Sequence, residues 1–281
     1  MPELPEVETM RRGILAIIGS RVRGVATEPC PRKPILLSPG IASFQRRTKD
    51  CRVVAVERLG KRVVVRLDSS DSILFEPRMT GLVLVADPPS VEHLRFRLDL
   101  AGGSIPSVWF WDRRGLGSVR LLTAQQLIAV SEGKLGTDAL TITSEQLRDV
   151  LAKSRRPIKV ALLDQRALAG VGNLYASEIL HRAKVHPETS CDRIKPAQWR
   201  LIHCFLGEVL NEAIQHEGST LSDGTYRNAL NKSGGYQNCH LVYDRAGDLC
   251  LSCQRGSIQR IVQGQRSTFF CAVCQRAARI R

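Results

Sequence analysis

Short runs of β-branched and aliphatic residues, separated by polar turns, dominate the first 130 or so residues of this 281-residue chain. Residues 52–58 and 62–67 are two such runs joined through Gly60, and together they predict a β-hairpin. Four further runs continue the pattern, at residues 73–75, 82–85, 94–100 and 108–111. The N-terminal part of the chain is therefore predicted to be mainly β.

Apolar residues recur at helical spacing in several other segments. One of them, residues 6–18, lies within the β-rich part and predicts an N-terminal helix. After residue 121 helical patterns replace the strands. Thr143 and Gln146 match a capping box ahead of a helix to about residue 153. Three more helices are predicted at residues 157–167, 173–183 and 196–215.

The last part of the chain follows neither pattern. Residues 218–235 are polar and rich in glycine, and a loop of that length is usually functional or disordered. Residues 245–281 are rich in cysteine and arginine and predict a separate small module. The chain is therefore expected to be of the α+β class, with a mainly β part, a helical part and a cysteine-rich part at residues 1–130, 131–236 and 237–281.

Composition narrows the possible partners. The chain has 41 basic and 27 acidic residues, a formal net charge of +14 and a pI near 9.8. A charge of this size favours a polyanionic partner, and nucleic acid is the best candidate. The longest apolar run near the N-terminus, residues 14–18, is too short for a signal peptide or a membrane span. We therefore expect a cytoplasmic protein that binds no membrane and keeps its nine cysteines reduced or metal-bound.

Four of the cysteines form two CxxC pairs, Cys250 with Cys253 and Cys271 with Cys274, separated by 17 residues. This spacing is typical of a tetrahedral zinc site. The alternatives are two disulfides, which a cytoplasmic location disfavours, and an iron–sulfur centre, which the spacing matches less well. Because a four-thiolate site has no open position, we expect one structural Zn²⁺ and no catalytic metal.

Pro2 is the candidate nucleophile. A proline in the second position permits removal of Met1, and the exposed secondary amine could then attack an electrophilic sugar carbon to form an iminium ion. A free α-amino group has a pKa of about 7.7–8, against about 10.4 for lysine, so far more of it is neutral at pH 7. Glu3 and Glu6 could move the protons. Alternatively, Pro2 stiffens the N-terminus and the two acids suit the helix dipole.

A second motif lies in the helical part. Gly170 and Gly172 predict a tight turn, and Asn173 opens the helix that follows it. Main-chain N–H groups at a helix N-terminus bind anions such as a DNA phosphate. A dinucleotide site would need a third glycine, where Tyr175 stands, and a preceding strand, so we reject it. Glu178 is expected to order the turn.

These features resemble, in the same order, those of the bacterial formamidopyrimidine-DNA glycosylases. These are bifunctional repair enzymes for oxidised purines and share a fold with the endonuclease VIII group. The resemblance covers essentially the whole chain and is most specific at residues 2–9, at residues 164–180 and in the cysteine module. It implies an N-terminal β-sandwich led by a helix, a helix-two-turns-helix domain with a lesion loop, and a C-terminal β-hairpin zinc finger. Leu4, where endonuclease VIII members typically carry glycine, favours the formamidopyrimidine side.

The resemblance implies roles for single residues. Lys61 matches a hairpin lysine that contacts the DNA beside the lesion, and we group it with the catalytic residues Pro2, Glu3 and Glu6. An ordinary turn lysine is the alternative. Other positions match residues that lie near the DNA backbone, namely His93, Lys159, Asn173 and Arg266. For His93 the alternative is an ordinary core or surface histidine.

Three further positions match the residues that fill the gap left by a flipped nucleotide. Met79 offers flexible apolar surface, and Arg114 can hydrogen-bond the orphaned partner base. Many members have phenylalanine at the third position, where Leu116 stands in this chain. Leucine still wedges but stacks poorly, so the choice of the opposite base stays open.

The function implied by the resemblance is excision of oxidised purines, such as 8-oxoguanine and formamidopyrimidines, from duplex DNA by a nucleoid-associated monomer. The damaged nucleotide is flipped out of the helix. Pro2 displaces the base at C1′, and β,δ-elimination then cleaves the strand. Two alternatives stay open: an endonuclease VIII-like enzyme for oxidised pyrimidines, and a zinc-finger protein that binds damaged DNA without catalysis.

Overall fold

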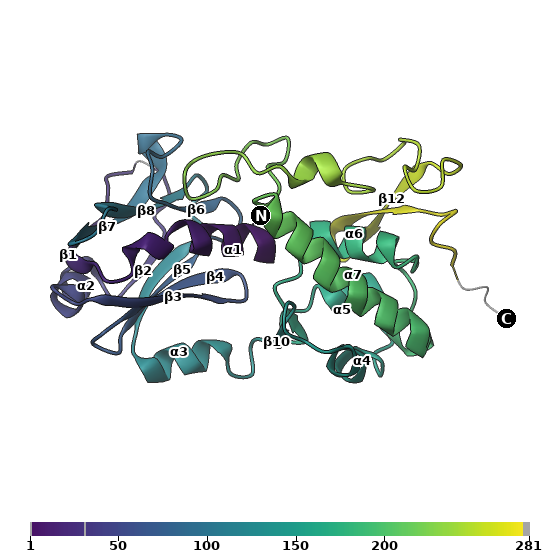
Figure 1. Cartoon of the computed structure of the whole chain (residues 1–281), viewed down its shortest axis with the longest axis horizontal. Coiled ribbons are helices and arrows are strands. Elements are labelled where there is room, and N and C mark those ends of the chain that lie inside the picture. Colours follow the sequence, from purple (N-terminus) through teal and green to yellow (C-terminus); the bar gives the residue numbers. More distant parts are fainter. Residues whose placement is uncertain (1, 31, 278–281) are drawn as a thin grey trace. The chain divides into compact units, whose positions relative to one another are not determined.

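The computed structural model describes residues 2–30 and 32–277. Met1, whose removal the predicted chemistry requires, lies outside the described residues. The chain forms two compact units, coloured along the sequence in Figure 1. Unit 1 consists of Met1–Glu132 and Ala213–Gln237, and unit 2 of Gly133–Glu212 and Asn238–Arg281. The division of the chain into folding domains at residues 130 and 236 stays a prediction.

Unit 1 is built on two sheets. One is antiparallel with the strand order β1-β7-β8-β6, and the other has the order β2-β9-β5-β4-β3 with only the β2–β9 pair parallel. The strands are β1 (Arg21–Ala26), β2 (Leu36–Ser38), β3 (Val53–Leu59), β4 (Arg62–Leu67), β5 (Ser72–Glu76), β6 (Gly81–Leu84), β7 (Leu94–Ala101), β8 (Ser107–Asp112) and β9 (Ser118–Leu122). The helices are α1 (Leu4–Gly13), α2 (Ile41–Thr48) and α3 (Ala124–Ser131), with 3₁₀ turns η1 (Leu15–Ile17) and η2 (Val91–His93).

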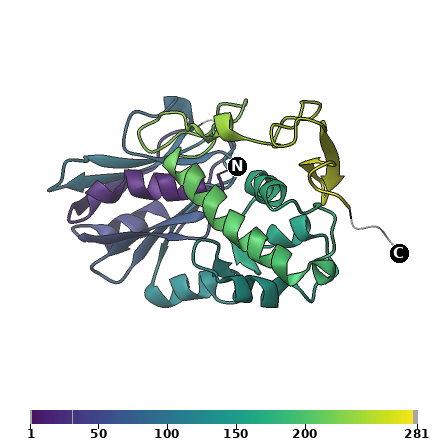
Figure 2. The same ribbon diagram turned by 45° about the vertical axis from the view of Figure 1, so that its right-hand side comes forward.

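Aromatic side chains join the two sheets of unit 1. The ring of Phe75 on β5 lies 6.1 Å from that of Phe96 on β7 and 5.9 Å from that of Phe110 on β8. Val7 and Met10 of α1 enter the same core. α1, the purple helix of Figure 2, contacts β3, β4 and β6. Because both sheets turn their apolar faces to one core, the predicted β-sandwich with its N-terminal helix is confirmed.

The predicted hairpin at residues 52–67 is β3–β4. Leu59 pairs with Arg62, so Gly60 and Lys61 are the two central residues of a tight turn. Gly60 has φ +57°, a left-handed conformation that glycine adopts without a steric penalty. Lys61 is therefore held at the end of the hairpin.

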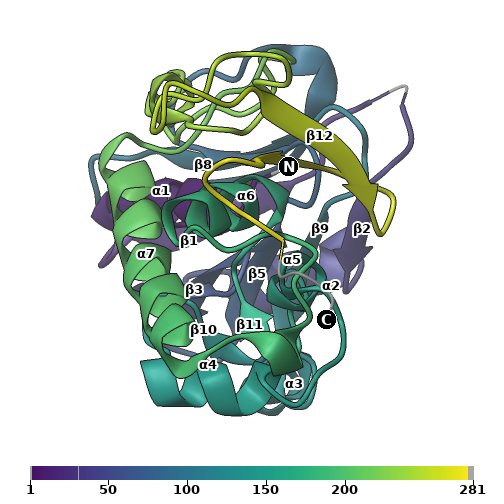
Figure 3. The ribbon, with the colours of Figure 1, turned by 90° about the vertical axis from the view of Figure 1, so that its right-hand side faces the viewer.

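Unit 2 combines short helices with a separate hairpin. Its elements are β10 (Thr137–Asp138), α4 (Ser144–Leu151), α5 (Ile158–Leu162), β11 (Leu168–Ala169), α6 (Asn173–Arg182), η3 (Cys191–Arg193), β12 (Ile258–Gln263) and β13 (Arg266–Cys271). α7 (Pro196–Gln215) and η4 (Tyr236–Cys239) each cross the boundary between the units. Figure 3 faces unit 2, where the antiparallel hairpin β12–β13 contacts α6. No helix within the described residues is long and apolar enough to cross a membrane.

Several of these elements lie where the local sequence pattern predicted them. α7 has the predicted bounds, and α6 ends one residue before the predicted end. α4 begins with the predicted capping box, in which the Thr143 hydroxyl accepts from Gln146 N at 3.2 Å and the Gln146 side chain accepts from Thr143 N at 3.0 Å. Residues 218–235 contain no helix or strand, as expected.

The helix predicted at residues 157–167 is wrong in its length, because α5 ends at Leu162. Side chains beyond that point bind the main chain in place of the helical pattern. The Asp164 carboxylate accepts from Arg166 N at 3.1 Å, and the Gln165 side chain contacts both Gly170 N and Val171 O, at 3.0 and 2.8 Å. Such local bonds compete with helix formation.

Glu178 does not bind the turn at Gly170–Gly172 as predicted. It is fully buried in α6, and its carboxylate accepts three main-chain N–H groups, from Leu241, Val242 and Tyr243, at 2.8–3.0 Å. It therefore fixes the segment that leads into the cysteine module.

Replacing Glu178 by glutamine should destabilise the protein by about 2–4 kcal/mol, because the new NH₂ group would face Leu241 N and leave a buried donor unsatisfied. Urea unfolding measures this loss. Glu145→Gln, on exposed α4 surface, should change stability by less than about 0.5 kcal/mol. Equal effects of the two variants would contradict the role given to Glu178.

Candidate functional site

The N-terminal residues of unit 1 are buried at the start of α1. Pro2 is buried, and Glu3 and Glu6 are 5% and 3% exposed. Glu3 is the N-cap of α1 and forms a capping box with Glu6, whose Oε2 accepts from Glu3 N at 2.8 Å. The structure thus brings the three N-terminal site residues together.

Glu6 also binds the polar loop at residues 218–235. Its Oε1 accepts from Ser219 N at 2.9 Å, so one carboxylate holds both the N-terminus and the beginning of the loop. Gly218 has φ +80°, and a Cβ there would lie 2.8 Å from Glu6 Oε1. The close approach of the loop to Glu6 therefore requires glycine at this position.

The loop at residues 218–235 is held by its own polar side chains. The Thr220 hydroxyl donates to Tyr226 O at 2.8 Å and accepts from Gly234 N at 2.9 Å. The Tyr226 hydroxyl donates to Glu217 O at 2.9 Å, and its side chain joins the sandwich core. Burial and the charge of Glu6 raise the pKa of Tyr226 well above its usual range, so the phenol stays neutral.

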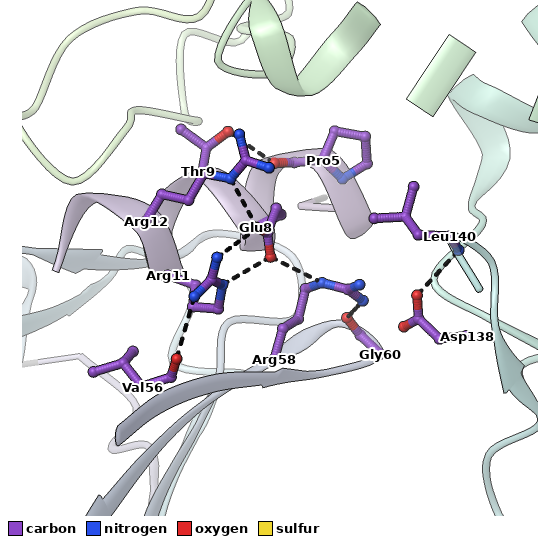
Figure 4. A network of polar contacts seen from close by, with 10 residues as sticks. All are labelled: Pro5, Glu8, Thr9, Arg11, Arg12, Val56, Arg58, Gly60, Asp138 and Leu140. Carbon is purple, nitrogen blue, oxygen red and sulfur yellow. Dashed lines mark hydrogen bonds and ion pairs between the residues drawn. The ribbon is translucent and has the colours of Figure 1, made fainter. Parts of the chain in front are cut away.

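Glu8 is the centre of an ion network on α1, drawn in Figure 4. It is 7% exposed, and its oxygens accept from Arg11 at 2.8 and 2.9 Å, from Arg12 at 2.8 Å and from Arg58 at 3.2 Å. Burial opposes ionisation, but the hydrogen bonds and positive charges of these arginines lower the pKa of Glu8 to about 2. Arg58 also donates to Gly60 O at 3.0 Å, one residue before Lys61.

The three predicted wedge residues lie on two adjoining loops of unit 1. Met79 and Arg114 are exposed, and Leu116 is half-buried. Asp112, fully buried, accepts from Arg114 N at 3.1 Å and from Gly117 N at 2.7 Å and is hydrogen-bonded to the Thr80 hydroxyl. The Asp112 carboxylate therefore joins the loop that carries Met79 to the loop that carries Arg114 and Leu116.

His93 makes its contacts outside these two loops. It is 8% exposed, its ring meets the edge of Trp111 at 5.4 Å, and its Nε2 lies 3.1 Å from a Glu92 carboxylate oxygen. These contacts fit the packing role that was the alternative for this histidine. Its contact with the DNA backbone stays a prediction.

The predicted phosphate-binding residues of unit 2 are connected to one another. Lys159 is fully buried, and its Nζ donates to Asn173 Oδ1 at 2.5 Å. Asn173 Nδ2 donates in turn to Ser267 O at 3.0 Å, next to the exposed Arg266. The hairpin tip has Gly264 and Gln265 at φ +53° and +61°, so Arg266 directly follows the tip, whereas Arg260 lies within β12.

The four cysteines of the module converge. Their sulfur atoms all lie within 4.8 Å of one another, with Sγ–Sγ distances of 3.8 Å for Cys250–Cys274 and 3.7 Å for Cys253–Cys271. A tetrahedron of thiolates bound at about 2.3 Å has S–S edges of about 3.8 Å. The sulfurs are therefore spaced as a four-coordinate metal requires.

Sequence patterns missed several residues that shape the site. Glu8 carried a usable signal, because Arg11 and Arg12 follow it at helical spacing. Ser219 and Asp112 carried none, because their partners are distant in sequence or lie on the main chain.

Comparisons with known proteins agree with this geometry. The family model described as "Formamidopyrimidine-DNA glycosylase N-terminal domain" matches residues 1–119, and the model described as "Formamidopyrimidine-DNA glycosylase H2TH domain" matches residues 135–225. The formamidopyrimidine-DNA glycosylase of Chloroflexus aurantiacus is 39% identical over 98% of both chains. That of Streptococcus mutans is 34% identical over 98% of this chain and all of its own.

Solved structures show the same fold. MutM (Fpg) from Thermus thermophilus superimposes with a TM-score of 0.84 at 33% identity, with 98% of both chains covered. A Lactococcus lactis Fpg mutant in complex with DNA containing Fapy-dG gives 0.86 at 29% identity and covers 98% of this chain and all of its own. The fold and the site thus define a DNA glycosylase of base-excision repair. The chain belongs to the formamidopyrimidine-DNA glycosylase family.

Glu8 should give the protein a stability that depends on pH. The pKa of Glu8 is lowered from 4.5 to about 2 in the fold, so its contribution is present above about pH 4.5 and is lost as the pH falls toward 2. The contribution is up to about 3 kcal/mol at neutral pH. Urea unfolding of wild type and Glu8→Gln should show this difference at pH 7 and a smaller one near pH 3. A difference that does not vary with pH would contradict the assignment.

Proposed function

We propose that this protein removes oxidised purines, 8-oxoguanine and formamidopyrimidines, from duplex DNA and then cleaves the abasic strand by β,δ-elimination. The observation that carries the proposal is the arrangement at the start of α1. A proline whose nitrogen can become the N-terminal amine stands beside Glu3, and Glu6 hydrogen-bonds both to this end and to the polar loop. The substrate class is supported by the names of the relatives and by the Lactococcus lactis enzyme in complex with Fapy-dG DNA.

The proposed chemistry starts at the Pro2 nitrogen. The amine attacks C1′ of the flipped nucleotide, the C1′–base bond breaks, and the base leaves with a proton. Glu3 supplies a proton to the ring oxygen O4′, the C1′–O4′ bond breaks, and the nitrogen, which has lost its own proton, forms the iminium ion with C1′. The resulting iminium ion loses the 3′ phosphate by β-elimination and the 5′ phosphate by δ-elimination. Glu6 holds the N-terminus through Glu3 N and thereby keeps the amine in place. No redox step is involved.

The remaining predicted residues are assigned to DNA contact. Lys61 approaches the strand beside the lesion, and the wedge residues Met79, Arg114 and Leu116 fill the space of the flipped nucleotide. Exposed Arg266 supplies a phosphate contact, and we propose that His93, Lys159 and Asn173 lie near the backbone or order the groups that touch it. The protein acts as a monomer in this proposal.

We further propose that Cys250, Cys253, Cys271 and Cys274 hold one Zn²⁺. The 3.7–3.8 Å sulfur separations support a tetrahedral thiolate site. The ion would stabilise the hairpin that carries Arg266 and take no part in the reaction.

A second candidate is excision of oxidised pyrimidines. One of the similar structures is wild-type Lactococcus lactis Fpg with DNA containing an oxidised pyrimidine, at 29% identity and a TM-score of 0.85. The same nucleophile and wedge would serve, and only the contacts to the base would differ.

Borohydride should trap a covalent adduct between this protein and a duplex carrying one 8-oxoguanine opposite cytosine. The reason is that borohydride reduces an iminium ion to a stable amine. The adduct is read as a shifted band on a denaturing gel, and intact mass shows whether Met1 is absent from the reacting protein.

The matched control is a protein that retains a residue before Pro2, so that the proline nitrogen is an amide. It should bind the duplex but form no adduct. An equally strong band from this control would contradict the role of Pro2. A band only with oxidised-pyrimidine duplexes would favour the second candidate, and binding without any band would favour a non-catalytic protein.

Metal analysis should find about one zinc ion per chain. Cys253→Ser should lower the zinc content and the melting temperature and weaken DNA binding, because the hairpin loses its support. Cys204→Ser removes an exposed thiol outside the cluster and should keep the zinc. Full zinc content in Cys253→Ser would overturn the assignment.

A further inference from the structure

Glu8 is a buried carboxylate that the proposed chemistry does not use. It lies on α1 five residues after Glu3, and its oxygens are occupied by hydrogen bonds from three arginines. Arg11 and Arg12 come from the same helix, so their pairing with Glu8 is local. Arg58 comes from β3, and its contact is the long-range part of the network (Figure 4).

Arg58 bridges two parts of unit 1. Its side chain is 10% exposed, Nε donates to Glu8 Oε2 at 3.2 Å, and Nη1 donates to Gly60 O at 3.0 Å. A guanidinium group is planar and donates from separate nitrogens, so one side chain fixes both partners in a set geometry. Gly60 is followed directly by Lys61 in the two-residue turn.

We propose that Glu8 is a positioning residue that, through Arg58, holds the Gly60–Lys61 turn in place relative to the helix that starts at Pro2. This inference rests on the proposed function, because it takes Pro2 as the nucleophile and Lys61 as a contact to the same DNA strand. Under that assignment, Glu8 sets the distance between the attacking amine and the point where the strand is held. Reactions of this kind lose rate steeply when the reacting groups are displaced by about 1 Å.

Anchoring of α1 to the sandwich does not depend on this bridge. Val7 and Met10 are buried in the common core, and Arg11 Nη1 donates separately to Val56 O on β3 at 3.3 Å. The bond from Arg58 to Gly60 O therefore adds control of the turn to an attachment that already exists.

The first test compares two single variants with a matched control. Glu8→Gln removes the charge of the acceptor, and Arg58→Lys keeps the positive charge but lacks the second nitrogen. Both should slow borohydride trapping under single-turnover conditions by between about 10-fold and 100-fold. Binding to a duplex with a tetrahydrofuran abasic analogue should weaken by a smaller factor.

Arg12→Gln is the matched control. It removes an arginine from the same carboxylate, but Arg12 is 55% exposed and its ion pair with Glu8 lies within one helix. Its trapping rate should stay within about twofold of wild type, because exposed ion pairs contribute little. An effect of Arg12→Gln as large as that of Arg58→Lys would overturn the proposal.

A double-mutant cycle tests the route through Lys61. Glu8→Gln should slow the wild-type protein but have no further effect in a Lys61→Ala background, since the positioned group is then absent. Additive losses, or a lower melting temperature with an unchanged trapping rate, would leave Glu8 a purely structural role. A wild-type protein that forms no adduct would reject the proposed function itself, and the inference with it.

The pH profile separates positioning from proton transfer. Because the pKa of Glu8 is about 2, the group stays ionised through the working range. Glu8→Gln should therefore lower the rate by one constant factor between about pH 5 and about pH 9. A changed shape of the profile would mean that Glu8 exchanges protons during the reaction and would overturn the positioning role.

Discussion

The carboxylate of Glu6 is the interaction on which the candidate site depends most. One oxygen of Glu6 accepts from Glu3 N at the start of α1, and the other accepts from the N–H of Ser219, which lies 213 residues after Glu6 in the chain. Both bonds are buried, where an unsatisfied N–H group costs about 1–3 kcal/mol, so losing either would be costly. A single side chain thus makes the N-terminus and the polar loop one structural unit. The proposed nucleophile needs that constraint, because a free chain end is among the most mobile parts of a protein.

Single polar side chains also order the loops that carry the other predicted site residues. Asp112 binds the main chain of the loop that carries Arg114, and it also binds the hydroxyl of Thr80, which follows Met79. The side chains of Met79 and Arg114 remain exposed. In unit 2, the side chain of Asn173 accepts a hydrogen bond from Lys159 and donates one to Ser267 O, next to exposed Arg266. Buried polar groups therefore order loops, while the groups available to a ligand stand next to them. The proposed DNA contacts need such ordered loops, since phosphate contacts fix the position and orientation of a protein on DNA.

Sequence predicted those features whose partners are close along the chain. The CxxC pairs, the capping box at Thr143 and the turn at Gly60 all depend on residues a few positions apart, and each appears as expected. Predictions failed where the local structure depends on partners that are distant in sequence or on side chains that compete for the main chain. The helix expected beyond Leu162 loses to side chains that bind their own main chain. Glu178 reaches across 63–65 residues to a segment that no periodicity connects to it.

The buried ion network around Glu8 is better explained by the directional hydrogen bonds that it provides than by its contribution to the stability of the fold. Three arginines surround one carboxylate, so two positive charges are left over in a chain that already carries +14. Well-packed apolar residues often stabilise a fold as much as a buried ion network, because desolvating the charges costs several kcal/mol per ion. Apolar side chains could pack α1 against β3, but they could not donate to Gly60 O. The directional bond from Arg58 is therefore the feature that an ionic network supplies and a hydrophobic contact cannot.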